Sequence, residues 1–333
     1  MEFDAELTPG ARNAVRICLN VRPDERVTVV TDRASQEIAA ALVHEVDEVG
    51  AERAVFVLED LAPRPLAALP AGVAADMERS QVSIFAAQAQ ANELGARIAM
   101  TDIVNRRRMR HGHMVNITRQ IMCDGMRADF HEVDRLSTKV IEVVRRARTI
   151  RATTPAGTDL TAALDPALRW IKTSGLITTE KWGNLPGGEV FTTPRDVNGT
   201  FVIDGVVGDW LCDRYGRLGD SPLTVRIENG RLVGASSDNQ SLCQDFWTYT
   251  HQDENSDRVG EFAIGTNVGV GAIIGQILQD EKFPGVHIAF GNPYGAHTGA
   301  SWWSSSHIDV VGTEFDVWAD DQPIMSRGKF LIS

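Results

Sequence analysis

Residues 26–58 read RVTVVTDRASQEIAAALVHEVDEVGAERAVFVL and set the expected fold class. The β-branched run 26–32 predicts a strand, apolar residues at helical spacing over 35–49 predict a helix, and 53–58 predicts a second strand. Because a strand, a helix and a strand at this spacing form a right-handed parallel unit, the N-terminal half is predicted to be an open α/β sheet.

The same alternation continues to about residue 148. Segments 82–86 and 97–101 are further strand candidates, and 114–148 predicts a long helical region whose basic tail, VVRRAR, suits a helix C-terminus. The expected N-terminal domain therefore spans residues 1–148 as a doubly wound sheet. No GxGxxG follows its first strand, so dinucleotide binding is not supported.

A second domain is expected over residues 149–333, because the composition changes there to Thr, Gly, Asp and alternating apolar residues. The alternation over 159–164 and 223–233 predicts half-buried strands. The pair Asn229-Gly230 stands between two alternating runs and predicts a tight hairpin. We therefore expect an α/β protein whose C-terminal domain is strand-rich, of the α+β kind, and carries the functional site.

Composition limits the partners. The 333 residues include 33 Lys+Arg and 45 Asp+Glu, a formal charge of −12, which argues against nucleic acid because phosphate binding needs Lys and Arg. A small peptide or another small molecule is the expected substrate. The N-terminus lacks the apolar core of a signal peptide, no apolar run reaches the length of a membrane span, and the four cysteines form no CxxC pair. We expect a cytoplasmic protein with reduced cysteines and no membrane partner.

Acids and histidines gather in four short motifs of the second half. They read NLPGGEVFTTP at 184–194, GEFAIGTN at 260–267, DEKFPGVHIAFG at 280–291 and SSSHID at 304–309. The acidic and histidine residues stand among apolar residues and glycines, where a buried carboxylate is costly unless it is paired or binds a cation. His307 and Asp309 are separated by one residue, so on a strand both point to one face and can share an ion. Such a pair on its own is more often a hydrogen-bonded structural pair.

The four motifs, in this order, resemble those of the thermophilic aminopeptidases, the metallo-aminopeptidases of the aminopeptidase T and aminopeptidase S type. A tyrosine also stands seven residues after the histidine of the third motif. The resemblance covers roughly residues 150–333, and four ordered motifs are more specific than any one of them. It implies a metal-dependent hydrolase that releases N-terminal residues from short peptides, and it implies a homodimer.

For the site, the resemblance implies a centre of two divalent ions, zinc or cobalt or manganese, with a bridging water. The implied ligands are Glu189, Glu261, His287, His307 and Asp309. Glu261 would be shared by the two ions, Glu189 would be either a ligand or a proton shuttle, and Tyr294 would stabilise the oxyanion. His297 lies in the same stretch but belongs to no motif.

Three features depart from the resemblance. The chain is shorter than typical members of the family, mainly in its N-terminal half. The segment before the last histidine reads SWWSSSH where a polar run is expected, so Trp302 and Trp303 are either core residues or candidate substrate contacts. The run RRRMRHGH at 106–113 is either a solvated helix end or a segment from which His111 or His113 reaches the cleft and binds an anionic group of the substrate.

An alternative function comes from proteins that resemble 2,5-dihydroxypyridine dioxygenase, which share the superfamily. In that case one Fe(II) held by Glu261, His307 and Asp309 would open the ring of a small aromatic acid or hydroxypyridine. Glu189 and His287 favour the hydrolase with two ions, because a centre with one iron is expected to lack the glutamate of the first motif. A binding protein that keeps the metal residues without catalysis is a third hypothesis.

Overall fold

The structure, a computed structural model, describes residues 2–208 and 210–332 and divides into two compact units. Unit 1 comprises Met1–His131 and Gly175–Gly187, and unit 2 comprises Glu132–Ser174 and Gly188–Ser333. The boundary predicted after residue 148 falls inside unit 2. The reason is that α7 (Phe130–Val144) contributes Val140 and Val144 to the core of that unit.

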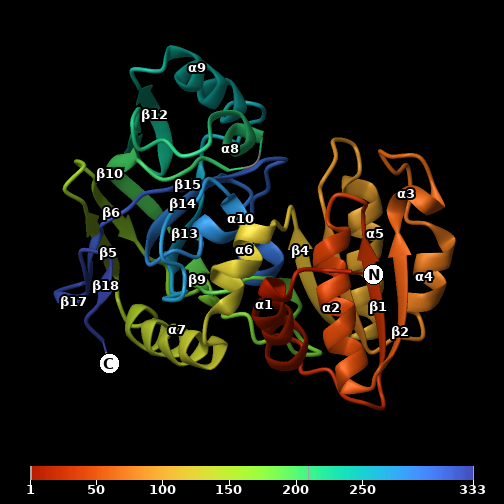
Figure 1. The fold of residues 1–333 in the computed structure, drawn as a ribbon. Helices are drawn as coiled ribbons and strands as arrows, with labels where there is room; N and C mark the ends of the chain where they lie inside the picture. The colour runs from red at the N-terminus through yellow and green to blue at the C-terminus, as the bar shows by residue number, and fades with distance from the viewer. Residues whose placement is uncertain (1, 209, 333) are drawn as a thin grey trace. The chain divides into compact units, whose positions relative to one another are not determined.

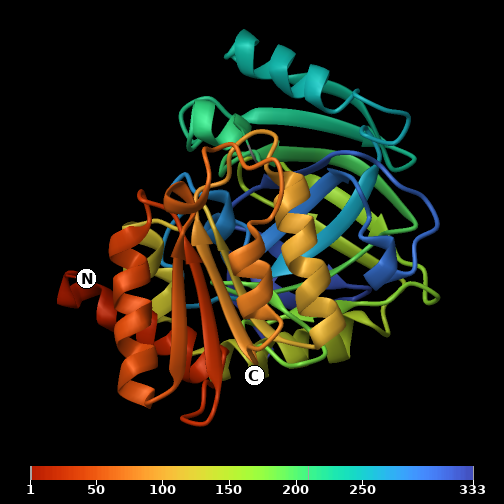
Figure 2. The same ribbon diagram turned by 90° about the vertical axis from the view of Figure 1, so that its right-hand side faces the viewer.

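Unit 1 is built on a parallel sheet in the order β2-β1-β3-β4-β8. Its strands are β1 (Arg26–Thr31), β2 (Glu52–Val57), β3 (Val82–Ala87), β4 (Arg110–Val115) and β8 (Gly183–Asn184). Helix α2 (Gln36–Val49) lies on one face, and α4 (Ala71–Met77) and α5 (Leu94–Arg107) lie on the other (Figure 2). The predicted doubly wound sheet is confirmed, as are the first three predicted strands and the helix between the first two.

Two predictions for unit 1 are wrong. Segment 97–101 is not a strand but part of α5, whose buried residues Ala96, Met100 and Val104 recur at helical spacing. The strand that follows is β4, whose sequence RHGHMV is too polar to predict a buried strand. Region 114–148 is helical as predicted only in its second half, where α7 spans Phe130–Val144; β4 runs to Val115, and short helices lie between the two.

The remaining helical elements of unit 1 are short. They are η1 (Ala5–Leu7), α1 (Thr8–Arg12), η2 (Asn13–Cys18), α3 (Leu58–Leu61), α6 (Arg119–Cys123) and η3 (Gly125–Arg127). All four cysteines of the chain are free thiols. None of the helices described is both long and apolar enough to cross a membrane.

Unit 2 contains two antiparallel sheets, in the orders β12-β11-β10-β6-β5-β16-β17-β18 and β15-β14-β13-β9-β7 (Figure 1). The larger sheet consists of β5 (Thr149–Thr153), β6 (Asp159–Ala163), β10 (Asp196–Ile203), β11 (Leu223–Glu228), β12 (Arg231–Ser236), β16 (Asp316–Ala319), β17 (Gln322–Ser326) and β18 (Lys329–Phe330). The smaller sheet consists of β7 (Ile171–Thr173), β9 (Glu189–Thr192), β13 (Val259–Gly265), β14 (Gly285–Gly291) and β15 (His307–Val311). Besides α7, the helices are α8 (Trp210–Tyr215), α9 (Gln240–Tyr249), α10 (Ile277–Asp280) and α11 (Gly295–Thr298). The predicted hairpin at Asn229-Gly230 is confirmed, because β11 pairs with β12 across it.

The core of unit 2 joins the two sheets. Alternate residues of the smaller sheet, such as Phe262 on β13 and Phe290 on β14, share one apolar cluster with Phe201 of the larger sheet. Each such side chain contributes about 1.5–3 kcal/mol by leaving water. Because side chains alternate along a strand, this core also fixes the opposite face of β9, β13, β14 and β15.

The entry to β9 depends on a glycine. Gly188 has a φ of +133°, and a Cβ there would lie 2.5 Å from the Cβ of Asn267 and 2.9 Å from its backbone. Gly188→Ala is therefore expected to destabilise unit 2 by about 2–4 kcal/mol, through backbone strain and the clash together. Urea unfolding followed by circular dichroism measures this difference.

The matched control is Gly234→Ala on β12, where an added Cβ meets nothing within 4 Å. We expect that variant to unfold within about 0.5 kcal/mol of the parent. Equal losses in the two variants would contradict the role assigned to Gly188.

Candidate metal centre

The predicted ligands lie on one face of the smaller sheet of unit 2. Along β15, Ile308 and Val310 point into the core, so His307 and Asp309 point the other way. The same alternation turns Glu261 on β13 and His287 on β14 to that face, because their neighbours in sequence belong to the core. Glu189 is the first residue of β9, beside the core residue Val190.

Strand register brings these residues together. Ala289 on β14 pairs with Glu261 on one side and with Asp309 on the other. The small side chain of Ala289 therefore lies between two carboxylates on this face of the sheet. Glu189 pairs with Gly265 at the far end of β13, and His287 lies opposite Ala263, two residues nearer the centre of that strand.

Two overlapping groups of ligand atoms result. Within the described part of the chain, the donor atoms of Glu189, Glu261 and His287 lie within 4.8 Å of one another, and so do those of Glu261, His307 and Asp309. One carboxylate oxygen of Glu261 is 3.5 Å from Nε2 of His287, and the other is 3.8 Å from Nε2 of His307. Glu261 thus stands between the two groups.

His287 provides the test of whether the site suits a metal ion. Its imidazole is 1% exposed, and its Nε2 has no hydrogen bond of normal geometry to any described residue. The atom lies 3.5 Å from a carboxylate oxygen of Glu189 and 3.5 Å from one of Glu261. A buried nitrogen that faces two carboxylates without bonding to them is what a divalent ion with nitrogen and oxygen ligands requires.

His307 is oriented for the same purpose. Its Nδ1 lies 2.9 Å from the backbone carbonyl of Asn292, to which it donates. In the neutral ring this leaves Nε2 without a proton, 3.4 Å from the Oδ1 of Asp309. A histidine whose other ring nitrogen donates to a carbonyl is typical of metal ligands, because the hydrogen bond fixes both the tautomer and the ring plane.

The ionisation states show how strongly the groups interact. Burial favours the neutral ring of His307, but the carboxylates of Asp309 and Glu261 raise its pKa to about 10. Burial likewise favours the neutral form of Asp309, but His307 lowers the pKa of this carboxyl to about 2. Burial raises the pKa of Glu261. Without a bound metal ion, protonated imidazoles therefore neutralise part of the negative charge of the carboxylates. A bound divalent ion would displace these protons.

Lys282 and Glu281 belong to this cluster, although sequence reasoning did not identify them. The ammonium of Lys282 is 2.8 Å from Oε1 of Glu189 and 2.5 Å from Oε1 of Glu281, and Lys282 is 1% exposed. Burial raises the pKa of Glu281 to about 8. The available signal was a charged pair inside the third motif, DEKFPG, directly before a fully buried strand.

Asp253 is a second residue that sequence reasoning missed. Its Oδ2 accepts hydrogen bonds from the backbone N–H and the hydroxyl of Ser305, both at 2.7 Å. It also accepts from Ser304 and from the backbone of Asn255. These bonds fix the loop that leads into His307. No local pattern predicts a contact over 52 residues.

The aromatic candidates lie around this loop. The ring of Tyr294 is 4.5 Å from that of His307, between centroids, and the residue is 42% exposed. Trp302 lies under the guanidinium of Arg258, 4.3 Å away, while Trp303 is 67% exposed. Trp303 is therefore not a core residue, and contact of either indole with a substrate stays a prediction.

His111 and His113 lie in unit 1, on β4. Nδ1 of His111 hydrogen-bonds Ser83 at 2.8 Å, and its Nε2 is 3.1 Å from Nδ1 of His113. Burial lowers the pKa of His111 to about 3 and also lowers that of His113, so both rings are neutral. This placement gives no support to the predicted binding of an anionic group. Arg106 and Arg108 at the end of α5 form ion pairs with Glu78 and Glu180, as expected of a solvated helix end.

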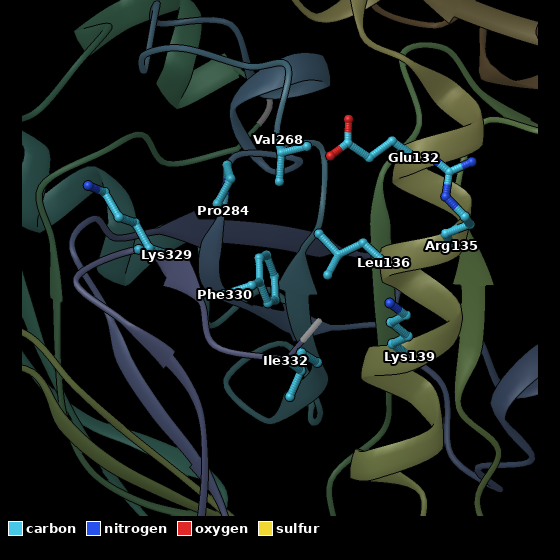
Figure 3. Close-up of a pocket in the computed structure, with 10 residues that line it drawn as sticks. Glu132, Arg135, Leu136, Lys139, Val268, Pro284, Lys329, Phe330 and Ile332 are labelled. Atoms are coloured by element: carbon cyan, nitrogen blue, oxygen red, sulfur yellow. The ribbon is translucent and has the colours of Figure 1, made fainter.

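A cavity of about 510 Å³ lies elsewhere in unit 2, between α7 and the C-terminal segment (Figure 3). Cationic side chains from α7 and β18 surround it together with apolar ones. The lining residues are Glu132, Arg135, Leu136, Lys139, Val268, Pro284, Gly328, Lys329, Phe330 and Ile332. The carboxylate and histidine ligands do not line it, so it is distinct from the metal centre.

Comparison with known proteins places these residues in context. Residues 114–314 match the family described as thermophilic metalloprotease (M29). Among solved structures, wild-type AmpT from Thermus thermophilus is similar with a TM-score of 0.70 and 18% identity, over 98% of this chain and 99% of that one. The 2,5-dihydroxypyridine dioxygenase from Pseudomonas putida KT2440 is similar with a TM-score of 0.70 and 15% identity, over 98% and 97%. No curated protein matches.

At these identities the two structures show a shared fold, and the fold predicted from the sequence is confirmed. The similarity to AmpT spans nearly the full length of both chains. The expected deficit in the N-terminal half is therefore not seen against that structure.

The Asp253 contacts lead to a prediction about stability. Asp253→Asn replaces a carboxylate oxygen by an amide that cannot accept from Ser305, so we expect a loss of about 1–3 kcal/mol at neutral pH. Burial would raise the pKa of Asp253, but its hydrogen bonds from Ser305, Asn255 and Ser304 lower it. The contribution is thus present above the unfolded pKa of about 3.9 and is lost as pH falls toward the lower folded value.

Urea unfolding at several pH values measures this. The difference between parent and variant should be largest near pH 7 and should narrow below about pH 4. Asp238→Asn, at an exposed position in the same unit, is the control and should change little. A difference that grew on acidification would contradict the assignment.

Proposed function

Because the chain belongs to the thermophilic metalloprotease (M29) family, we propose that it is an aminopeptidase that releases N-terminal residues from short peptides with two divalent ions. Family membership makes it a metal-dependent hydrolase. The observation that carries the finer proposal is the position of Glu261, whose two oxygens face two different imidazoles. One carboxylate can thereby serve two adjacent ions.

The residues present fit such a centre. Glu189, Glu261 and His287 would hold one ion, and Glu261, His307 and Asp309 the other. A mixture of imidazole and carboxylate ligands suits zinc, cobalt or manganese. When bound, ions of this kind polarise a scissile carbonyl and lower the pKa of a bridging water.

The side chains around the ligands divide the remaining tasks. Oε1 of Glu189 accepts from Thr173 at 2.8 Å and from Lys282 at 2.8 Å, which leaves Oε2 to act as a ligand or to move a proton. Tyr294 is half-exposed and its ring lies 4.5 Å from that of His307, so its phenol would be the group that donates to a developing oxyanion.

A second candidate function is ring opening by one Fe(II). The observation that favours it is the equal structural similarity, a TM-score of 0.70, to AmpT and to the dioxygenase. Glu261, His307 and Asp309 would be the ligands of that iron. Glu189 and His287 argue for the hydrolase, because they complete a second group of ligands around the same carboxylate.

The first test uses the shared carboxylate. Glu261→Gln is expected to lower the binding of both ions and to slow amino-acid release from dipeptides by more than about 100-fold, since a lost ligand costs more than a lost orienting group. Metal analysis of the purified protein and a ninhydrin assay of released amino acids measure the two effects. Glu228→Gln, at an exposed position on β11, should leave both unchanged.

One iron per chain, with oxygen consumption on hydroxylated aromatic rings and no release of amino acids, would establish the dioxygenase instead. A protein that keeps full metal content and peptidase activity in Glu261→Gln would overturn the shared-ligand centre.

The second test separates the two positions. His287→Ala is expected to bind one ion, held by Glu261, His307 and Asp309. His307→Ala is also expected to bind one ion, held by Glu189, Glu261 and His287. Equilibrium dialysis of chelator-stripped protein against zinc measures the stoichiometry. His297→Ala, in the same stretch but exposed, is the matched control. Two ions bound in both ligand variants would exclude this assignment.

A further inference from the structure

The buried ammonium of Lys282 lies at one end of the metal centre and not at the other. Its Nζ contacts Oε1 of Glu189 and Oε1 of Glu281, at 2.8 and 2.5 Å. Glu189 belongs to only one of the two ligand groups, the one with His287. Of the two groups, as far as the described residues show, only the one with Glu189 therefore contains a carboxylate that is paired with a lysine.

The backbone around Lys282 holds this ammonium in place. The Lys282 N–H donates to the carbonyl of Gln279 at 2.8 Å, and the Lys282 carbonyl accepts from Asn267 at 3.0 Å. The carboxylate of Asp280 accepts from three consecutive backbone N–H groups in the loop before α10, those of Ile274, Gly275 and Gln276. The segment is thus pinned on both sides, and the lysine side chain is almost fully buried. It cannot move into water when another cation arrives nearby.

Charge decides what this arrangement does. Glu189, Glu261 and Asp309 are 7%, 4% and 9% exposed, so the charges of these carboxylates are poorly screened. Lys282 offsets part of this charge beside Glu189. A divalent ion bound beside Glu189 is attracted less strongly, because Lys282 already neutralises part of the charge of that carboxylate and its ammonium repels the ion. Among the described residues, Glu261 and Asp309 form ion pairs with histidines and with no lysine or arginine, so an ion held by Glu261, His307 and Asp309 would have no ammonium paired with one of its ligands.

We propose that Lys282 is a resident cation that makes the two metal positions unequal. It weakens the position at Glu189, Glu261 and His287 and stabilises the folded chain when that position holds no ion. The position at Glu261, His307 and Asp309 fills first. This inference rests on the proposed centre of two ions and adds the order in which the ions bind.

Lys282→Met tests the proposal, because methionine fills a similar volume without charge. Calorimetric titration of chelator-stripped protein with zinc should show that the dissociation constant of the weaker step falls by about tenfold or more, since a nearby repulsion is removed. The metal-free variant should have a lower Tm than the metal-free parent, because buried carboxylates lose their partner. Saturating zinc should narrow that difference.

Two results would overturn the proposal. A weaker step of unchanged affinity, with a Tm lowered equally with and without zinc, would make Lys282 a purely structural residue. A weaker step of reduced affinity would mean that Lys282 acts mainly by orienting Glu189. Lys172→Met is the matched control. Lys172 lies on β7, the strand beside β9, and its ammonium pairs with Asp134 of α7 at 2.7 Å. Its replacement should leave both zinc affinities unchanged.

Glu281→Gln provides a second variant if Lys282→Met does not fold without metal. Without this carboxylate, the ammonium of Lys282 pairs with Glu189 alone. The zinc affinity of the weaker step should therefore fall several-fold, while the affinity of the stronger step stays the same. An increased affinity of the weaker step would contradict the proposal.

The same experiments distinguish failure of this proposal from failure of the proposed function. If the parent binds two zinc ions with unequal affinity and releases amino acids, but Lys282→Met leaves the affinity of the weaker step unchanged, only the role of Lys282 is rejected. Tighter binding at the weaker step in Lys282→Met, in a protein that releases no amino acids from peptides, would reject only the aminopeptidase.

Discussion

Buried carboxylates on one face of one sheet are the constraint on which the rest of unit 2 depends. Glu189, Glu261 and Asp309 are 7%, 4% and 9% exposed, and an isolated charge at such depth costs several kcal/mol. The fold tolerates them because Lys282, two imidazoles and, in the proposed state, metal ions lie among them. Stability and cation binding are therefore coupled in this part of the chain.

The geometry of the centre follows from the packing of the core. The strands that carry the ligands also carry Phe262, Ile288 and Ile308 on their other face, and these side chains belong to the core between the sheets. A slip of one residue in any of these strands would bury a ligand in the apolar core and expose a core residue. The large apolar burial thus fixes the register, and the register brings Glu261 and Asp309 to either side of Ala289.

The sequence predicts such features well where one local rule applies and poorly where distant segments decide. The first βαβ unit and the Asn229-Gly230 hairpin follow from local patterns and are confirmed. Segment 97–101 was misread because a short apolar run fits strand and helix alike, and β4 was missed because its buried histidines look polar.

The ligand residues came from a resemblance between motifs, and the structure brings those five side chains together. Their neighbours were harder to find. Asp253 acts across 52 residues, and the charged pair Glu281-Lys282 looks like a solvated turn until the chain is folded. Fold alone does not decide the chemistry either, since AmpT and the dioxygenase are equally similar in structure. If Lys282 sets how readily the second ion binds, then one buried ammonium determines whether Glu261 serves one ion or two. The number of ions in turn separates hydrolysis by a bridging water from chemistry at a single iron.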